Sequence, residues 1–388
     1  MRRVVGWAVE LATAPAWAAP SATTVSAEGG VEADSNVQRV DTGPGLDTRA
    51  VAAAVARVGA RLDHSARLWG GAYVLAVAAL SRVVGPDLES GSAVDRDALA
   101  VENVTFFSGD VKWVHPVGDR GISTGVGLTF ADAVPLSDAI GSRTFRTLGA
   151  DALLVMRGGG DPSEPRAMLT LAAGGRSFAY KPDHDFDWYG PSASARLDVT
   201  LWQHPDRIRS LELVATLGAE ARSYNSNALA SACPKGAPPD PSCSAGTSIP
   251  RRDRYQRAGV ELTYTGSFLA AAGYQATLVD SNSYGQSVVR HRATLSATKD
   301  LKWQLYGTAL ATLQLDQYLD GLVVAEDLQN QTFSSIEDEN RSSLQLRLAR
   351  AVTAAWSVES RAAIWRDLGG DMTSFRRELF YVGAIYNR

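Results

Sequence analysis

The sequence has few of the residues on which catalytic and metal sites usually depend. Its 388 residues include only two cysteines and five histidines, and no two histidines have the i, i+4 spacing of a helical metal pair. No Gly-x-Ser-x-Gly elbow and no Walker loop occur. His184, between Asp183 and Asp187, is interpreted as part of a solvated acidic turn. We therefore expect a protein that is not an enzyme and that binds neither a metal nor a cofactor.

Long apolar runs are also absent. No stretch approaches the roughly 18 uninterrupted apolar residues of a transmembrane helix. The net charge is −4 and charged residues make up 21% of the chain, so the composition suggests neither nucleic-acid binding nor disorder.

What the sequence does contain is alternation of apolar and polar residues. In residues 301–318, Leu313 and Leu315 fall on one face of an extended chain, and Thr312 and Gln314 fall on the other. Segments of this kind follow one another to the end of the chain. They predict an all-β protein, an antiparallel up-and-down transmembrane β-barrel, in which half of every strand faces a polar interior.

Sixteen strands are favoured over eighteen. The expected strands are 31–42, 48–62, 66–83, 98–117, 120–133, 142–157, 166–180, 186–202, 207–224, 254–266, 268–281, 284–299, 301–318, 340–351, 353–367 and 373–388. Tight breaks such as Asp63-His64-Ser65 follow the even-numbered strands. The longest breaks, 84–97, 225–253 and 319–339, follow odd-numbered ones. This parity is that of bacterial barrels, which have short periplasmic turns, long outer loops and both termini in the periplasm.

Two segments allow a second interpretation. The alanine-rich residues 48–62 also fit helical spacing, so a periplasmic helix is the alternative to a strand there. The N-terminus, with Arg2 and Arg3 before a mostly apolar stretch, reads as a signal peptide cleaved after Ala18 or Ala19, and the alternative is a short amphipathic helix. The expected organisation is a signal peptide over 1–19, a flexible lead over 20–30 and a barrel over 31–388.

Cys233 and Cys243 enclose a stretch rich in proline and glycine within the longest predicted loop. Two inert thiols are one interpretation. In an exported protein a disulfide that closes the loop is favoured.

The charged residues that the alternation places inside the barrel are mostly arginines. The inward arginines are Arg57, Arg61, Arg143, Arg157, Arg176, Arg196, Arg222, Arg257, Arg290, Arg292, Arg347 and Arg361. The inward acids are Asp151, Asp198, Glu212, Glu220, Glu261 and Glu359. This surplus predicts a pore biased towards anions. The alternative is that arginines and acids pair across neighbouring strands to hold the wall, as Glu359 and Arg361 with Arg347 would.

Aromatic residues near strand ends are typical of the girdles at the membrane interfaces, and simple packing is the alternative for any single one. Such residues are Trp188, Tyr189, Trp202, Tyr224, Tyr318 and Trp365.

Four short motifs carry a resemblance to a known family. They are Asp34-Ser35-Asn36-Val37, Ser281-Asn282-Ser283-Tyr284-Gly285 leading to Arg290-His291-Arg292, Glu339-Asn340-Arg341-Ser342-Ser343, and Arg376-Arg377. From about residue 31 to 388, the chain resembles the proteobacterial outer-membrane barrels of exopolysaccharide secretion. These include the barrel of the poly-N-acetylglucosamine porin and the stand-alone export barrels of myxobacteria. The chain differs in having no helical repeats before the barrel and in ending on Arg388 instead of an aromatic residue.

The resemblance implies an integral outer-membrane pore for a secreted polysaccharide. The expected partners are outer-membrane lipid, the barrel-assembly machinery, a separate periplasmic polysaccharide-export protein and the polysaccharide itself. The alternatives are a diffusion porin for small anionic solutes and a structural anchor of an envelope-spanning motility or adhesion complex.

Overall fold

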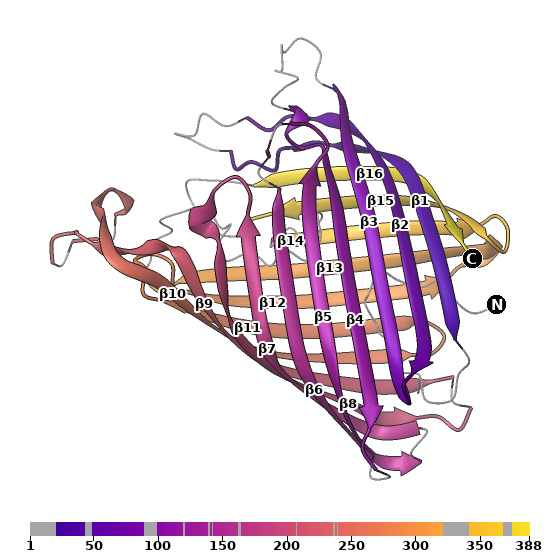
Figure 1. The fold of residues 1–388 in the computed structure, drawn as a ribbon. Helices are drawn as coiled ribbons and strands as arrows, with labels where there is room; N and C mark the ends of the chain where they lie inside the picture. Colours follow the sequence, from indigo (N-terminus) through magenta and orange to yellow (C-terminus); the bar gives the residue numbers. More distant parts are fainter. Residues whose placement is uncertain are drawn as a thin grey trace.

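The chain forms a closed antiparallel β-barrel of sixteen strands in the computed structural model (Figure 1). The structure describes residues 21–388 apart from 43–48, 89–98, 119–120, 139, 142, 162–163, 207, 236, 239, 321–340 and 368–374. The first eight strands are β1 (Ala22–Asp34), β2 (Ala53–Leu68), β3 (Gly71–Asp87), β4 (Val104–Pro116), β5 (Ile122–Pro135), β6 (Phe145–Asp161), β7 (Glu164–Tyr180) and β8 (Trp188–Gln203). The second eight are β9 (Ser210–Ser231), β10 (Ser244–Thr265), β11 (Leu269–Ser281), β12 (Val288–Asp300), β13 (Leu305–Tyr318), β14 (Ser342–Ala351), β15 (Trp356–Arg366) and β16 (Arg376–Asn387).

Each strand pairs with its sequence neighbours, and β1 pairs with β16 to close the barrel. The predicted fold class and strand number are therefore confirmed. No helix among the described residues has the length and apolar character needed to cross a membrane.

The two faces of the wall differ in their exposed side chains. On β13, Leu313 and Leu315 are 44% and 48% exposed, whereas Thr312 and Gln314 are buried. Since the sheet is closed on itself, the face with exposed leucines is the outside and the face with buried polar groups is the inside. The alternating segment 301–318 therefore has its apolar side chains outside the barrel and its polar side chains inside, as predicted.

The connections alternate in length. Those after even-numbered strands are short, as at Trp69-Gly70 between β2 and β3, and most of those after odd-numbered strands are longer, as between β1 and β2. We call the two ends of the barrel the short-turn end and the long-loop end. The first residues of β1 pair with the part of β2 just before its short turn, and the last residues of β16 pair with β1 there. β1 therefore begins, and β16 ends, at the short-turn end. Figure 1 shows the C label at that end.

The first strand differs from its prediction. β1 begins at Ala22 instead of residue 31, so most of the expected flexible lead is wall. Its small residues gave only a weak alternation in the sequence, but pairing with β2 on one side and β16 on the other fixes this segment. The predicted signal peptide, 1–19, lies outside the described residues.

β2 settles the ambiguous alanine-rich segment. It is a strand, and the alternative of a periplasmic helix is wrong. The strand also runs through the predicted turn at Asp63-His64-Ser65. The chain reverses instead at Trp69 and Gly70, whose φ values of 51° and 75° are left-handed.

The segment 225–253, predicted as a long loop, is mostly strand. β9 continues to Ser231 and β10 begins at Ser244, so the two strands form a hairpin that is longer than its neighbours. Figure 1 shows this hairpin extending away from the barrel at the long-loop end. The predicted loop 319–339 lies almost wholly outside the described residues.

Candidate functional site

The inner wall carries nearly all of the charged residues that the sequence placed there. Alternation and cross-strand register put all but one on the inner face. They are Arg57, Arg61, Asp151, Arg157, Arg176, Arg196, Asp198, Glu212, Glu220, Arg222, Arg257, Glu261, Arg290, Arg292, Arg347, Glu359 and Arg361. The exception is Arg143, which lies before the start of β6, in the connection at the long-loop end.

The structure adds inward charges that the sequence analysis missed. The added acids are Glu28, Glu32, Asp34, Asp63, Asp110, Asp253 and Asp316, and the added bases are Arg82, Lys112, Arg251 and Arg377. These acids offset much of the predicted arginine surplus. Three of them lie on β1, whose true extent the sequence did not reveal.

Four of the most deeply buried of these charges gather where β1 meets β16, which we call the closing seam. Asp34 accepts hydrogen bonds from Arg377, with Nη2 to Oδ2 at 2.6 Å, and from Arg82, with Nη2 to Oδ2 at 3.0 Å. Glu32 accepts from Arg82 Nη2 at 2.6 Å. The side chains of all four residues are at most 1% exposed. The seam is therefore held by buried charges that neutralise one another.

Other inward arginines are paired in the same way. Arg222 Nε donates to Glu220 at 2.5 Å. Glu359 forms ion pairs with both Arg347 and Arg361, as the structural alternative had it. Ion pairing, along a strand as well as across neighbouring strands, therefore accounts for several of the arginines that were interpreted as free charge in a pore.

Aromatic side chains cover the inner wall of β4 to β10 near the long-loop end. We call this set the aromatic girdle: Phe106, Phe145, Phe178, Tyr180, Trp188, Tyr224 and Tyr255. Neighbouring rings lie 5.9 Å apart between Phe145 and Phe178 and 6.1 Å apart between Phe178 and Trp188. These separations are those of favourable aromatic contacts, so the girdle is a packed layer.

Arg222 lies between two rings of this layer, those of Trp188 and Tyr255. Its Cζ lies 4.0 Å from the ring centroid of Trp188 and 3.7 Å from that of Tyr255. Arg251 repeats the arrangement over Tyr224 at 4.4 Å. A guanidinium held between ring faces gains cation–π attraction while its edge remains paired with a carboxylate.

Only some of the aromatic residues predicted at the membrane interfaces face the outside of the barrel. Tyr189 and Trp202 face outward, 65% and 45% exposed, as interfacial aromatics would. Tyr224 and Trp365 instead face inward and are buried, because alternation along their strands leaves the outer face to other residues.

Towards the short-turn end, the inner wall is more polar and more exposed. Arg196 pairs with Asp198 at 2.7 Å with its side chain 53% exposed, and Arg61 pairs with Asp63 at 2.7 Å with the acid 43% exposed. We call this region the polar wall: Arg61, Asp63, Arg196, Asp198, Glu212 and Glu261. The wall is not uniform, since inward residues of β6 and β15 near this end, such as Val155 and Ser357, are buried.

The motifs behind the family resemblance turn out to be structural. Asn36 donates through Nδ2 to the Arg376 carbonyl oxygen at 3.2 Å, and Glu378 N donates to Ser35 Oγ at 2.7 Å. Together with the bond between Asp34 and Arg377, these contacts bring the first and last motifs together at the closing seam. In the third motif, Arg341 pairs with Asp41 and Asp367.

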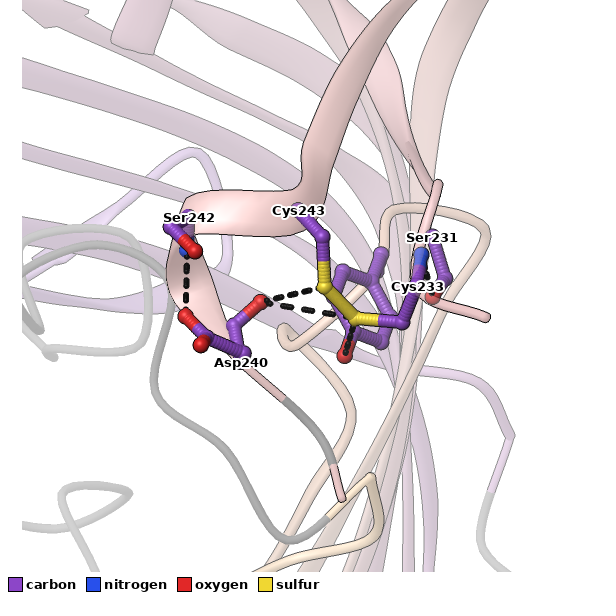
Figure 2. Close-up of a disulfide and its surroundings, with 6 residues drawn as sticks. Ser231, Cys233, Asp240, Ser242 and Cys243 are labelled. Atoms are coloured by element: carbon purple, nitrogen blue, oxygen red, sulfur yellow. Dashed lines mark hydrogen bonds between the residues drawn. A yellow bond between two sulfur atoms is a disulfide. The ribbon is translucent and has the colours of Figure 1, made fainter. Parts of the chain in front are cut away.

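The Ser281–Gly285 motif braces the long hairpin. Leu229 N donates to Ser283 Oγ at 3.0 Å, and Asn282 Nδ2 donates to the Pro250 carbonyl oxygen at 3.0 Å. At the tip of the hairpin, Cys233 and Cys243 form a disulfide, and the Asp240 carbonyl oxygen lies 3.2 Å from the Cys243 sulfur (Figure 2). The hairpin is therefore supported at its side and closed at its tip.

Removing the disulfide with the pair Cys233→Ser and Cys243→Ser is expected to loosen this tip alone. Closing a loop of this length contributes up to roughly 3 kcal/mol to local order. We expect trypsin to cut after Lys235 several times faster in the variant, with the unfolding midpoint of the barrel unchanged. Digestion followed by mass spectrometry measures the cleavage rate, and unfolding in urea measures the midpoint. A shifted midpoint would show that the disulfide supports the whole barrel instead.

Two acids outside the strands have lowered pKa values. Desolvation raises the pKa of Asp206, but hydrogen bonds from Ile208 N and from the Arg209 backbone and side chain together outweigh it and lower this pKa to about 2. Bonds from Ser242 lower the pKa of Asp240, which holds the hairpin tip in shape. Both acids stabilise turns. Among the described residues, no three histidine, cysteine, aspartate or glutamate side chains lie in a group able to hold a metal ion.

Comparison with known proteins gives fold likenesses only. No protein-family model and no curated protein sequence matches the chain. A loop-deletion form of OmpT, an outer membrane protein of Vibrio cholerae, is 12% identical with a TM-score of 0.44, and the match covers 95% of this chain and 100% of that one. Salmonella typhi OmpF in complex with daunomycin is 10% identical with a TM-score of 0.44, covering 95% and 97%. The Pseudomonas putida toluene transporter TodX is 9% identical with a TM-score of 0.36, covering 96% and 91%. Likeness at this level carries no argument about what this chain does, and none of the three is a polysaccharide-export barrel.

Proposed function

We propose that this barrel is an outer-membrane pore through which a secreted polysaccharide crosses. The observation that carries the proposal is the division of its inner wall into two zones. A polar wall with exposed hydrogen-bonding groups lies towards the short-turn end, and a packed aromatic girdle lines the inner wall of β4 to β10 near the long-loop end. We infer that this layer narrows the passage there. This arrangement suits a long hydrated chain that enters from one side through many weak contacts and leaves through a restricted exit.

Placement in the outer membrane is supported by the outer face. Leucines at 344, 346 and 348 are 43–52% exposed on an apolar surface that water would not favour. Trp69, Trp303 and Trp356 are 82%, 78% and 50% exposed at the short-turn end, where an interfacial girdle is expected. With short turns facing the periplasm, both termini would lie there, and the barrel-assembly machinery would be needed for insertion.

The paired charges favour a sugar chain over a small anion as cargo. A pore that selects anions needs inward cations without counter-charges. Here, Arg82, Arg222 and Arg377 are each paired with an acid. A near-neutral wall of hydroxyl, amide and charged groups instead offers hydrogen bonds to carbohydrate hydroxyl groups. A separate periplasmic polysaccharide-export protein is part of the proposal.

Single-channel recording in planar bilayers tests the narrowing. The wild-type barrel is expected to conduct poorly. Trp188→Ala with Arg222→Ala should raise the conductance by a factor of about two or more, because the narrowest section limits flow. Arg196→Ala, in the polar wall, is the matched control and should change the conductance little. A wide, constantly open and anion-selective wild-type pore would instead identify a diffusion porin.

Deletion of the gene tests the cargo. We expect surface polysaccharide to be lost and to return when the wild-type gene is supplied. Normal polysaccharide in the deletion strain would refute the export role.

A further inference from the structure

The geometry points to a binding site for a phosphate-bearing lipid on the outer face of β14, β15, β16 and β1. The inference rests on the proposed position of the barrel in the outer membrane but is independent of what passes through it. The site combines an apolar groove for an acyl chain with two arginines for the phosphate, which lie at the edge of the groove nearest the long-loop end.

The groove has a volume of about 470 Å³ and is lined almost entirely by apolar atoms. Along one row of the wall, Leu346 pairs with Ala362, Ala362 with Phe380, and Phe380 with Ala33. The two alanines are small, while Leu346 and Phe380 are 52% and 54% exposed, so the row has hollows between raised side chains. A second groove of about 490 Å³ shares Leu346, Ala362 and Phe380 with the first. Two connected grooves fit a lipid with more than one acyl chain.

Arg366 and Arg376 lie directly opposite each other on the same outer face, two residues along their strands from the groove residues Ile364 and Glu378. Two like charges in opposed positions destabilise a sheet unless an anion lies between them. Glu378 pairs with Arg376. Arg366 makes no hydrogen bond or ion pair with any residue in the part of the chain that the structure describes. One positive charge is therefore left at the head of the groove.

The height of this pair suits a lipid headgroup. Trp356 and Arg366 bound β15, with Trp356 at the short-turn end. The strand between them rises roughly 33 Å, and a tilt near 40° reduces this to roughly 25 Å along the axis, the height of the apolar band of such barrels. Arg366 and Arg376 thus stand at the outer interface, with the groove in the leaflet beneath them. Arginine binds phosphate through two parallel hydrogen bonds, which makes it suited to this position.

Lipid retention tests the inference. The barrel, purified in an uncharged maltoside detergent, is titrated with lipid A, and the lipid phosphate that co-elutes with the protein is measured. Arg366→Gln with Arg376→Gln should weaken binding about tenfold or more, because charge-assisted bonds to the phosphate are lost. Arg350→Gln removes an exposed arginine at the other end of β14 and should leave binding unchanged.

A second variant separates lipid from free anion. Ala362→Trp fills both grooves but keeps both arginines, and it should also weaken lipid A binding about tenfold. Inorganic phosphate should not compete. Competition by inorganic phosphate, unchanged binding in Ala362→Trp, or a second copy of the chain covering the groove would each overturn the inference. Membrane insertion is measured separately by bilayer conductance, so a barrel that inserts and conducts but retains no lipid refutes this site alone.

Discussion

Valine in place of Gly30 is expected to prevent the barrel from closing, whereas valine in place of the adjacent Gly29 is expected to leave it intact. The two residues are neighbours on β1, but they face opposite sides of the wall. A Cβ atom built on Gly29 meets nothing within 4 Å. A Cβ atom built on Gly30 overlaps the Val382 carbonyl oxygen and comes 2.5 Å from Cε2 of Tyr381.

The difference arises from the position of Tyr381. Its ring is fully buried and lies over Gly30 and Gly383, which pair across the closing seam. The Arg57 and Arg361 guanidinium carbons each lie 5.5 Å from the ring centroid. An aromatic ring that covers opposed glycines replaces the side-chain packing that they lack, and it requires both positions to remain glycine.

We expect Gly30→Val to destabilise the folded barrel by more than about 3 kcal/mol, because neither the backbone oxygen nor the ring has room to move. Refolding into detergent and loss of the heat-modifiable band on gel electrophoresis measure this. Gly29→Val should fold as wild type or better, since valine suits an exposed strand position. Tyr381→Phe keeps the ring and should also fold. Equal behaviour of the two valine variants would contradict the packing described for the seam.

The sequence predicted the architecture well because alternation is a local property. Every strand from β2 to β16 overlaps its predicted range, and inward residues such as Glu220, Arg222 and Glu261 follow from parity alone. The failure at β1 has a physical cause. Its outward positions include Ala27 and Gly29, which give little apolar contrast, so only pairing with both neighbouring strands identifies the segment as wall.

The candidate site could be predicted only in part, because ion pairs depend on contacts between distant strands. The pairing of Asp34 with Arg377 joins residues 343 positions apart, and no local pattern reveals it. The same holds for the contact of Arg222 with Trp188 and Tyr255, which lie on neighbouring strands at a register that the sequence does not give. Alternation along a strand shows which side chains face inward. The register between strands decides which of these charged side chains lie next to an opposite charge.

Asp34→Asn is expected to destabilise the barrel by about 3–5 kcal/mol, because two buried arginines lose a counter-charge while the shape of the side chain is kept. Arg377 donates to Asp34 from two nitrogen atoms, from Nε at 3.0 Å and from Nη2 at 2.6 Å. Arg82 retains Glu32. The loss should therefore come chiefly from Arg377, and equilibrium unfolding in urea, begun from folded barrel in detergent, measures it.

Asp63→Asn is the matched control, since the acid pairs with Arg61 on the same inner face at 2.7 Å but is 43% exposed. Water solvates both charges there, so the expected loss is below about 1 kcal/mol and should shrink further as salt is added. The loss at Asp34 should depend little on salt, because mobile ions do not reach a buried pair.

Replacing Arg377 as well tests whether its unpaired buried charge causes the loss of stability expected for Asp34→Asn. Arg377→Met alone leaves Asp34 with Arg82, and the double variant Asp34→Asn, Arg377→Met leaves no uncompensated charge between them. If the buried charge dominates, the double variant should be more stable than the sum of the two single losses predicts, as coupled residues in contact usually are. Additive losses would mean that each side chain contributes through its own packing, Arg377 for instance through the Trp365 ring centroid 4.7 Å from its Cζ. In that case, the closing seam would be held by shape instead of charge, and the Gly30–Tyr381 packing beside it would become its main determinant.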